Sequence, residues 1–144
     1  MIDFTIETHI ERPAGDVFAY VADPANLPAW QGTAVSARQE GSGPVGLGTR
    51  IREVHRGPRG KELEQVVEVS EYEPGRAFAL RLVEGALPIH LHVTFEDADG
   101  ATLMRFRPHG QPTGAMRLAQ PVLRRVLRRQ FAEDCARLRT ALER

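Results

Sequence analysis

The sequence predicts an α+β fold, with one antiparallel sheet and a long C-terminal helix packed against it. Residues 2–11 alternate between apolar and polar side chains, which is the period of a half-buried strand. Residues 33–109 contain six further strand-like segments separated by short turns. Residues 113–143 carry apolar side chains at steps of three or four, the spacing of one helix face. Such a helix would span about 45 Å and needs a broad apolar partner, which the strands supply.

Prolines divide the N-terminal region into a strand and two short helical pieces. In residues 2–11 the even positions hold Ile, Phe or Thr, so this face is predicted to point inward. Pro13 suits the first turn of a helix over residues 13–22, because its missing N–H costs nothing there. Pro24 ends that helix, since the residue before a proline is pushed out of the α region. Residues 25–30 are predicted to form a short helical turn or an irregular loop.

Six segments in the middle of the chain are predicted to be consecutive strands. They cover residues 33–40, 47–56, 61–72, 76–84, 87–97 and 101–109. Clusters of Gly, Pro, Asp and Ser separate most of them, as is typical of tight turns. Connections this short favour antiparallel neighbours, because a parallel crossover needs a dozen or more residues.

The last helix combines an apolar stripe with a basic face. The stripe consists of Ala119, Leu123, Leu127, Phe131, Cys135, Leu138 and Leu142. Pro121 falls inside the segment, so it either bends the helix or marks where the regular part begins. The arginines between 117 and 129 are interpreted as a solvated face and not as a nucleic-acid or membrane site. No aromatic residues are interleaved with them, and Glu133 can pair with Arg129.

Length, charge and cysteine content exclude several classes of protein. A chain of 144 residues is predicted to be a single domain, and its nineteen basic and nineteen acidic residues balance. No apolar run approaches the roughly 18 residues of a membrane span, and the acidic N-terminus is unlike a signal peptide. We therefore expect a soluble, cytoplasmic protein without an integral membrane segment and without nucleic acid as a partner. The single cysteine, Cys135, excludes an internal disulfide, and its place on the apolar stripe indicates a buried, inert thiol.

Two histidines on one predicted strand are candidates for chemistry. His90 and His92 share a side with Thr94 and Glu96. The run over residues 85–100 loosely resembles the first metal motif of cupins, but it departs in both glycine spacings and no second motif follows. We therefore predict no metal site, and the absence of a phosphate-cradling loop or dinucleotide fingerprint predicts no cofactor. The histidines lie most simply on the solvated face; if that face lined a cavity, either could act as a general base.

Other polar residues leave two interpretations open. Arg105, Arg107 and His109 share one face of the last strand, either as a solvated outer face or as an anion clamp at a pocket mouth. Gln65 falls on an otherwise apolar strand face. A buried amide needs partners, so it is either bonded in the core or presented to a ligand.

Three local patterns, together with the order of elements, carry a family resemblance. They are RPAGDVFAYVADPANLPAW at 12–30, VSEYEPGRAFAL at 69–80 and DGATLMRF at 99–106. The chain resembles the START-like (SRPBCC) superfamily, in particular its polyketide cyclase/dehydrase-like proteins, over essentially its whole length. The resemblance implies a single START-like domain over 1–144 with a helix-grip fold of the Bet v 1 type. In that fold a curved antiparallel sheet, here of about seven strands, wraps around the long helix and encloses a hydrophobic cavity.

The first functional hypothesis is binding of a small hydrophobic or amphipathic molecule, lipid-like or polyketide-like, between the sheet and the C-terminal helix. The predicted ligand contacts are Trp30, Gln65, Phe78, Leu80, Leu91, Met104, Phe106, Leu123, Leu127 and Phe131. Trp30 is included because the family often carries an aromatic residue near the cavity entrance. The alternative is a polyketide cyclase/dehydrase-type enzyme acting in the same cavity, which requires a titratable group inside it. A third hypothesis is a protein-interaction module with a closed core, and a homodimer stays open as an assembly state.

Overall fold

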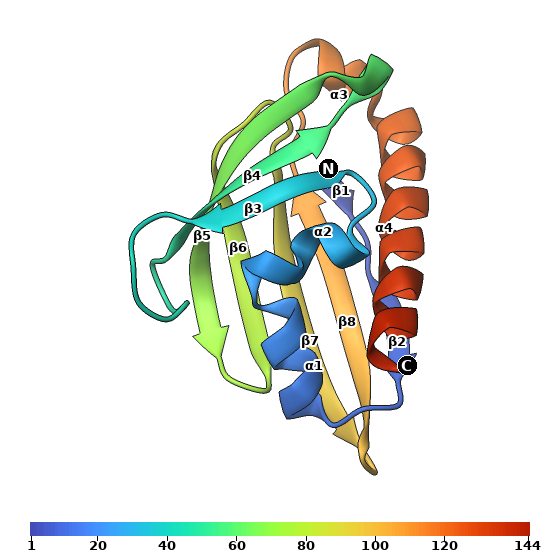
Figure 1. Ribbon diagram of the computed structural model, residues 1–144. Helices are drawn as coiled ribbons and strands as arrows, with labels where there is room; N and C mark the ends of the chain where they lie inside the picture. Colours follow the sequence, from blue (N-terminus) through green and yellow to red (C-terminus); the bar gives the residue numbers. More distant parts are fainter.

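The computed structural model describes residues 1–144 and shows an eight-stranded antiparallel sheet with one long helix along its open side (Figure 1). The strands are β1 (Ile2–Asp3), β2 (Ile6–Ile10), β3 (Ala34–Gln39), β4 (Arg50–Arg56), β5 (Glu62–Glu73), β6 (Ala77–Glu84), β7 (Ile89–Ala98) and β8 (Ala101–Gly110). The helices are α1 (Ala14–Val21), η1 (Pro24–Asn26), α2 (Leu27–Trp30), η2 (Pro58–Gly60), α3 (Ala115–Leu118) and α4 (Gln120–Leu142).

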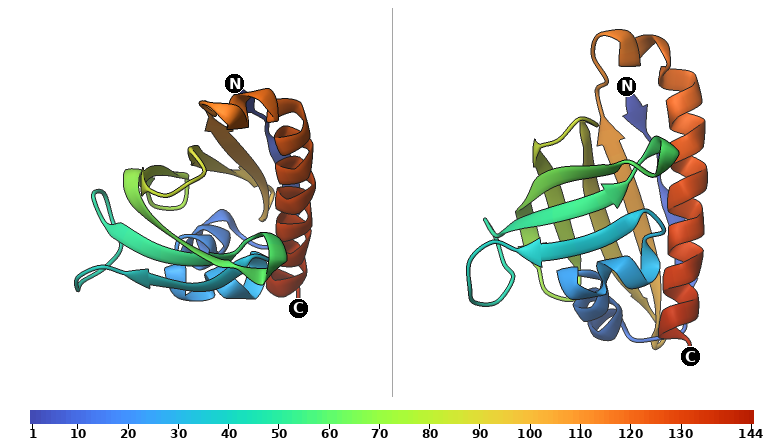
Figure 2. Two further views of the ribbon diagram at one scale, coloured as in Figure 1. Left: turned by 90° about the horizontal axis from the view of Figure 1, so that it is seen from above. Right: turned by 45° about the horizontal axis from the view of Figure 1, so that its top comes forward.

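The sheet is a meander closed by the N-terminal strands. Its order is β1-β8-β7-β6-β5-β4-β3, and β2 also pairs with β8. Seen from above, the sheet bends around an interior that α4 closes on one side (Figure 2). The predicted helix-grip fold is confirmed. The sheet has eight strands instead of about seven because the predicted strand over residues 2–11 is interrupted at Phe4 and Thr5. The even-numbered residues of this segment face inward, as predicted.

The two short helical pieces occupy one end of the curved sheet. Helix α1 begins directly after Pro13, buries Val17, Phe18 and Val21, and packs on β7 and β8. The Asp23 side chain accepts the N–H of Ala25 and so starts η1, which runs on into α2. Helix α2 contacts β3 and α4. Helices α1, η1 and α2 therefore cover the end of the molecule at which the C-terminal half of α4 meets the sheet.

Pro121 marks the beginning of the regular helix and does not bend it. It occupies the first turn of α4, where its missing N–H leaves no bond unmade. The short helix α3 precedes it, and Ala119 joins the two helices in a non-helical conformation with φ −91° and ψ 6°. Ala119 is therefore exposed, which corrects its assignment to the buried stripe. Leu127, Cys135, Leu138 and Leu142 of that stripe are buried.

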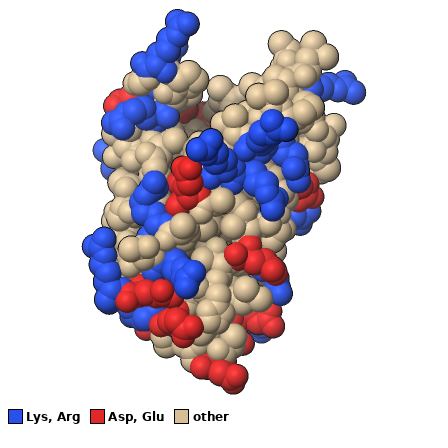
Figure 3. Space-filling model, turned by 90° about the vertical axis from the view of Figure 1, so that its right-hand side faces the viewer, with Lys and Arg blue, Asp and Glu red and all other residues tan.

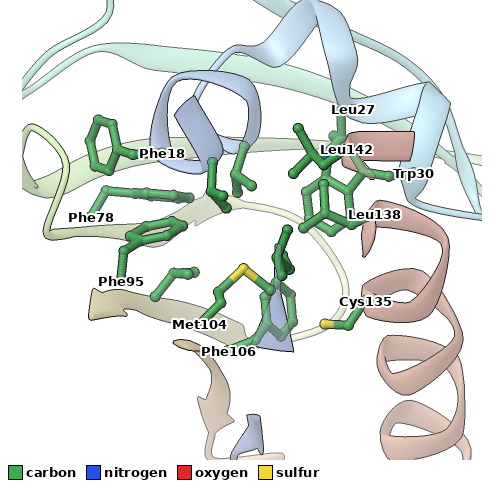
Figure 4. Close-up of a cluster of buried hydrophobic side chains, with 14 residues drawn as sticks. Phe18, Leu27, Trp30, Phe78, Phe95, Met104, Phe106, Cys135, Leu138 and Leu142 are labelled. Atoms are coloured by element: carbon green, nitrogen blue, oxygen red, sulfur yellow. The ribbon is translucent and has the colours of Figure 1, made fainter. Parts of the chain in front are cut away.

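A continuous hydrophobic core fills the end of the molecule covered by α1 and α2 (Figure 4). The Trp30 and Phe106 rings meet edge to face with centroids 6.2 Å apart. Phe18 makes edge contacts with Phe78 and Phe95, whose own rings are stacked. Aromatic side chains thus fill this end with close packing.

Asp134 is a carboxyl group buried within α4. Its side chain is 2% exposed; Oδ1 accepts the N–H of Gly32 at 2.9 Å and a bond from Arg137 at 3.3 Å, while Oδ2 has no partner. Burial raises the pKa of Asp134 above its ordinary value of 3.8, although Gly32 and Arg137 oppose the shift. Compared with the unfolded chain, the folded state therefore shifts this carboxyl group towards its protonated form.

This arrangement predicts a pH dependence of stability. A carboxyl pKa raised by folding contributes stability that is complete below pH 3.8 and is lost as pH rises through the folded pKa. Asp134→Asn keeps an acceptor for Gly32 but does not titrate. We expect the stability of the variant relative to wild type to rise from about pH 4 to about pH 7, measured by urea unfolding at each pH. A difference that stays constant across this range would contradict the prediction.

Cys135 is buried next to Asp134 on the inner side of α4. It is 1% exposed, and burial raises the pKa of its thiol to about 12. The thiolate is the reactive form, so we expect no alkylation of the folded protein by iodoacetamide at mildly alkaline pH and full alkylation after unfolding in urea. Mass spectrometry of the two samples checks this, and labelling of the folded protein at the rate of the unfolded one would contradict it.

Candidate functional site

A cavity of about 310 Å³ lies between the sheet and α4. Thirty residues line it, and eighteen of them are hydrophobic. Medium-sized side chains from the inner faces of β5, β6 and β7 form much of its wall, including Val67, Leu80 and Leu91. Pro58 of η2 and Leu87 of the β6–β7 turn also line it. The cavity is thus an apolar pocket of the kind that binds small molecules.

Most of the predicted ligand contacts line this cavity. They are Trp30, Gln65, Phe78, Leu80, Leu91, Leu127 and Phe131. The strands and α4 bring these side chains together because each lies on an inward face, as strand alternation and the helical stripe predict.

Met104, Phe106 and Leu123 do not line the cavity, which corrects their predicted role. Met104 and Phe106 face inward from β8 but are fully buried in the core, where the Phe106 ring packs against Trp30 and Phe131. Leu123 lies one turn before Leu127 on α4 and packs on the small cluster formed with Ile2 and Phe4. A side chain that points to the interior therefore does not necessarily line the cavity. Above β8, neighbouring aromatic rings fill the space.

A hydrogen-bonded polar cluster stands in the apolar wall of the cavity. It consists of Thr33, Glu53, His55, Gln65 and Gln130, all of which line the cavity. His55 Nε2 lies 2.8 Å from Glu53 Oε1, and Gln65 Nε2 lies 2.9 Å from the same oxygen. Thr33 Oγ1 lies 3.0 Å from His55 Nδ1 and 3.1 Å from Gln130 Nε2. One cluster thus combines residues of β4, β5 and α4 with Thr33, which immediately precedes β3.

The hydrogen bonds of this cluster form one chain that ends at Glu53. A carboxylate only accepts, so Gln65 and His55 Nε2 donate to Glu53. The Gln130 amide donates to Thr33 Oγ1, and the contact between Thr33 Oγ1 and His55 Nδ1 continues the chain. The chain therefore connects Gln130 of α4 to the Glu53 carboxylate on β4.

Glu53 is the most enclosed member of the cluster. Its side chain is 8% exposed and that of His55 is 20% exposed. Both hydrogen bonds to Glu53 arrive at Oε1, whereas Oε2 receives none. Oε2 is not one of the fully buried atoms without a partner, so it stays accessible, and Glu53 lines the cavity. Glu53 therefore brings an acceptor with free hydrogen-bonding capacity to the cavity wall.

Of the five cluster residues, only Gln65 was predicted from the sequence; Glu53, His55, Thr33 and Gln130 were not. The alternation within β4 carried a signal for two of them, because Ile51, Glu53 and His55 share one face and Ile51 points to the core. Strand pairing then sets Glu53 directly opposite Gln65. Thr33 and Gln130 are 97 positions apart, so only the folded chain brings them together.

The histidines singled out in the sequence lie on the outer face of the sheet. His92 Nε2 is 2.9 Å from Glu71, and His90 Nδ1 accepts the N–H of Leu82 at 3.0 Å. Leu91, between them, points into the cavity. The histidine face therefore does not supply a general base to the cavity, and no group of three or more His, Cys, Asp or Glu side chains converges to hold a metal ion.

The arginines of β8 are also placed outside the cavity. Arg105 pairs with Glu7 and Glu96, and Nε and Nη2 of Arg107 donate to the two carboxylate oxygens of Asp3 at 2.8 and 2.7 Å. The hydrogen bonds from Arg107 lower the pKa of the Asp3 carboxyl group. Arg105 and Arg107 therefore do not lie at the mouth of this cavity, and they hold the N-terminal strands against β8.

The basic face of α4 is exposed, as predicted. Figure 3 shows Lys and Arg side chains gathered on the upper half of the face that α4 presents. Arg129 lies 3.5 Å from Glu133, and the guanidinium groups of Arg124 and Arg128 lie over the Phe4 ring. None of the helices has the length and apolar character required to cross a membrane.

Comparison with solved structures supports the fold. The di-domain ARO/CYC BexL from the BE-7585A biosynthetic pathway is 17% identical with a TM-score of 0.78, over 97% of this chain and 46% of that one. Ara h 8.0201 is 14% identical with a TM-score of 0.68, over 97% and 96% of the two chains. The Aha1 dimer from Colwellia psychrerythraea is 14% identical with a TM-score of 0.68, over 99% and 97%.

Sequence families give a more specific result than these structures. A search of functionally curated proteins finds no match to the chain. Residues 1–143 match the family described as polyketide cyclase / dehydrase and lipid transport. With the helix-grip fold and its cavity, this match over nearly the whole length establishes that the chain belongs to the polyketide cyclase/dehydrase and lipid transport family.

Proposed function

We propose that the protein binds one small amphipathic molecule in the cavity between the sheet and α4. The observation that carries this proposal is a single polar cluster, ending in Glu53, set in an otherwise largely apolar wall. Such a wall favours a ligand with an apolar body, and the cluster fixes the orientation of one polar group. Phe78, Leu80 and Leu91 are the contacts proposed for the apolar body.

The volume limits the size of this ligand. Binding cavities for small molecules range from about 300 to 1,000 Å³, and the cavity here, at about 310 Å³, lies at the lower end. A single-chain lipid-like molecule or a compact polyketide-like molecule suits this space, whereas a two-chain phospholipid does not. The family description, which includes both cyclisation and lipid transport, supports either of the first two classes.

Native mass spectrometry of freshly purified protein tests the proposal. We expect an adduct of one small molecule per chain, which organic extraction releases for identification. If the protein is bare, titration with phenylnaphthylamine, a neutral apolar dye, should give saturable binding at one site. A bare protein that also fails to bind the dye would contradict the proposed function.

The same cluster favours a second candidate, an enzyme of the polyketide cyclase/dehydrase type. Glu53 Oε2 is a carboxylate oxygen without a hydrogen bond inside the cavity, and His55 and Gln65 hold the other oxygen in place. In this candidate Oε2 takes a proton from a carbon beside a ketone, and the C–H electron pair moves towards the carbonyl oxygen to give an enolate. The enolate carbon attacks a second carbonyl of the same molecule, a C–C bond forms, and Glu53 returns its proton to the new alkoxide.

Proton exchange separates the enzyme from a pure binding protein. We expect the enzyme to accelerate exchange of the methylene hydrogens of benzoylacetone in D₂O, as followed by NMR, and Glu53→Gln to abolish the acceleration. Glu71→Gln is the control, because Glu71 makes a similar contact with His92 on the outer face of the sheet. If benzoylacetone binds but its exchange is not accelerated, the result would contradict the enzyme candidate and would be consistent with a binding function alone.

A further inference from the structure

We infer that the ligand carries a hydrogen-bond donor, a hydroxyl or an ammonium group, which binds Oε2 of Glu53. The inference rests on the proposed function, because it specifies the polar group of the molecule that the cavity binds. It also predicts that the cavity discriminates against molecules whose polar end is a carboxylate. The class of ligand is therefore a small, largely apolar alcohol or amine.

The Glu53 carboxylate lies in an enclosed environment on the wall of the cavity. The side chain is 8% exposed and belongs to the inward face of β4, between Ile51 and His55. A charged group this far from water is stable only if its oxygens are hydrogen-bonded or paired with a cation. Oε1 receives both available donors, from His55 and Gln65, and Oε2 receives none.

The groups around Glu53 leave one of its oxygens without a donor. No Lys or Arg lies within ion-pair distance of Glu53, and its one close titratable partner is His55. His55 Nε2 and the Gln65 amide both donate to Oε1. Oε2 therefore has no donor from the protein. A ligand donor at Oε2 completes its hydrogen bonding, and an ammonium group also neutralises it.

An anionic ligand is disfavoured beside Glu53. A carboxylate group placed at Oε2 would bring two negative charges together in an apolar cavity, where their repulsion is weakly screened. Arg56, the last residue of β4, is the cationic side chain that lines the cavity, and it is exposed. It makes no ion pair with Glu53, so the polar cluster favours donors over anions.

Four molecules with the same apolar chain test this inference. Octylamine, octanol, octane and octanoate differ in the terminal group, and their affinities can be compared by calorimetry at neutral pH. The fluorescence of Trp30, the single tryptophan, serves as a local reporter because this side chain lines the cavity. We expect octylamine and octanol to bind roughly ten- to hundredfold more tightly than octanoate, as is typical of hydrogen bonds to a charged group.

Matched variants assign the preference to Glu53. Glu53→Gln replaces Oε2 or Oε1 by an NH₂ donor with nearly the same shape, and we expect it to reduce octylamine affinity at least tenfold while octane affinity is unchanged. Glu71→Gln, which alters a histidine-paired glutamate on the outer face, should leave all four affinities unchanged. Circular dichroism and thermal melts of both variants confirm that they are folded.

The outcomes separate this inference from the proposed function. If octanoate binds as tightly as octylamine, or if Glu53→Gln leaves the preference intact, the inference is overturned while the cavity remains a binding site. If none of the four molecules binds and phenylnaphthylamine does not bind either, the proposed function fails and the inference fails with it. If wild type prefers octylamine and octanol and Glu53→Gln removes this preference, the result supports both the proposed function and the inference.

Discussion

Replacing Leu127 by tryptophan is expected to abolish ligand binding without unfolding the protein. Leu127 lines the cavity from α4 and is 6% exposed, so a larger ring at this position must enter the cavity or displace its neighbours. The cavity holds about 310 Å³, near the lower limit for a small-molecule site, and tolerates little loss of volume. We expect the affinity for phenylnaphthylamine to fall at least tenfold, since the indole ring occupies space that the dye needs.

Leu123→Trp is the matched control for this change. Leu123 lies one turn earlier on the same helix, packs on the cluster of Ile2, Phe4 and Leu127, and does not line the cavity. Both substitutions should cost about 1–3 kcal/mol of stability through overpacking, but only the change at Leu127 should affect binding. Dye fluorescence, excited outside the tryptophan absorption band, measures the two affinities. Equal dye affinity in Leu127→Trp and wild type would show that the ligand occupies a different site.

Phe106→Ala is expected to cause the largest loss of stability of any single truncation considered for this protein. The Phe106 side chain is fully buried on β8, and its ring lies 6.2 Å from that of Trp30 and 5.2 Å from that of Phe131. Truncation removes the buried ring and leaves a hole that rigid neighbours on β8, α2 and α4 can fill only in part. Such changes cost about 3–5 kcal/mol, a large part of the roughly 5–15 kcal/mol by which domains are stable.

Urea unfolding followed by far-UV circular dichroism measures this loss, and Phe106→Leu should lose less because it retains an apolar side chain at the site. Val126→Ala is the control on the exposed side of α4. Its side chain is 54% exposed, so we expect a change within about 0.5 kcal/mol. A loss below about 1 kcal/mol for Phe106→Ala would mean that the ring is not an essential part of the core.

The sequence predicted most of the secondary structure because local periodicity and turn chemistry agree with the fold. Each of the six middle strands lies within two or three residues of its predicted bounds. The prolines were also informative, because Pro13 and Pro121 lie at the beginning of α1 and α4, where the missing N–H of proline costs no hydrogen bond. The interruption at Phe4 and Thr5 was not predicted, since alternation alone continues through it.

The binding site was predictable in part. Phe78, Leu80 and Leu91 follow from strand alternation, and Leu127 and Phe131 from the helical stripe. Met104 also faces inward by strand alternation, but it lies in the core. An inward-facing side chain lines the cavity only where side chains from other elements do not fill the space beside it. The outer-face position of His90 and His92 agrees with their alternation against Leu91.

Local periodicity was enough to assign faces: it predicted which residues of each strand and of α4 point inward, and that a long apolar helix stripe must cover a sheet. It could not predict where inward-facing residues from different elements meet. Strand register placed Glu53 opposite Gln65, and the docking of α4 brought Gln130 to Thr33. Periodicity is a property of neighbouring residues, whereas the polar cluster and the cavity depend on the relative positions of elements far apart in the chain.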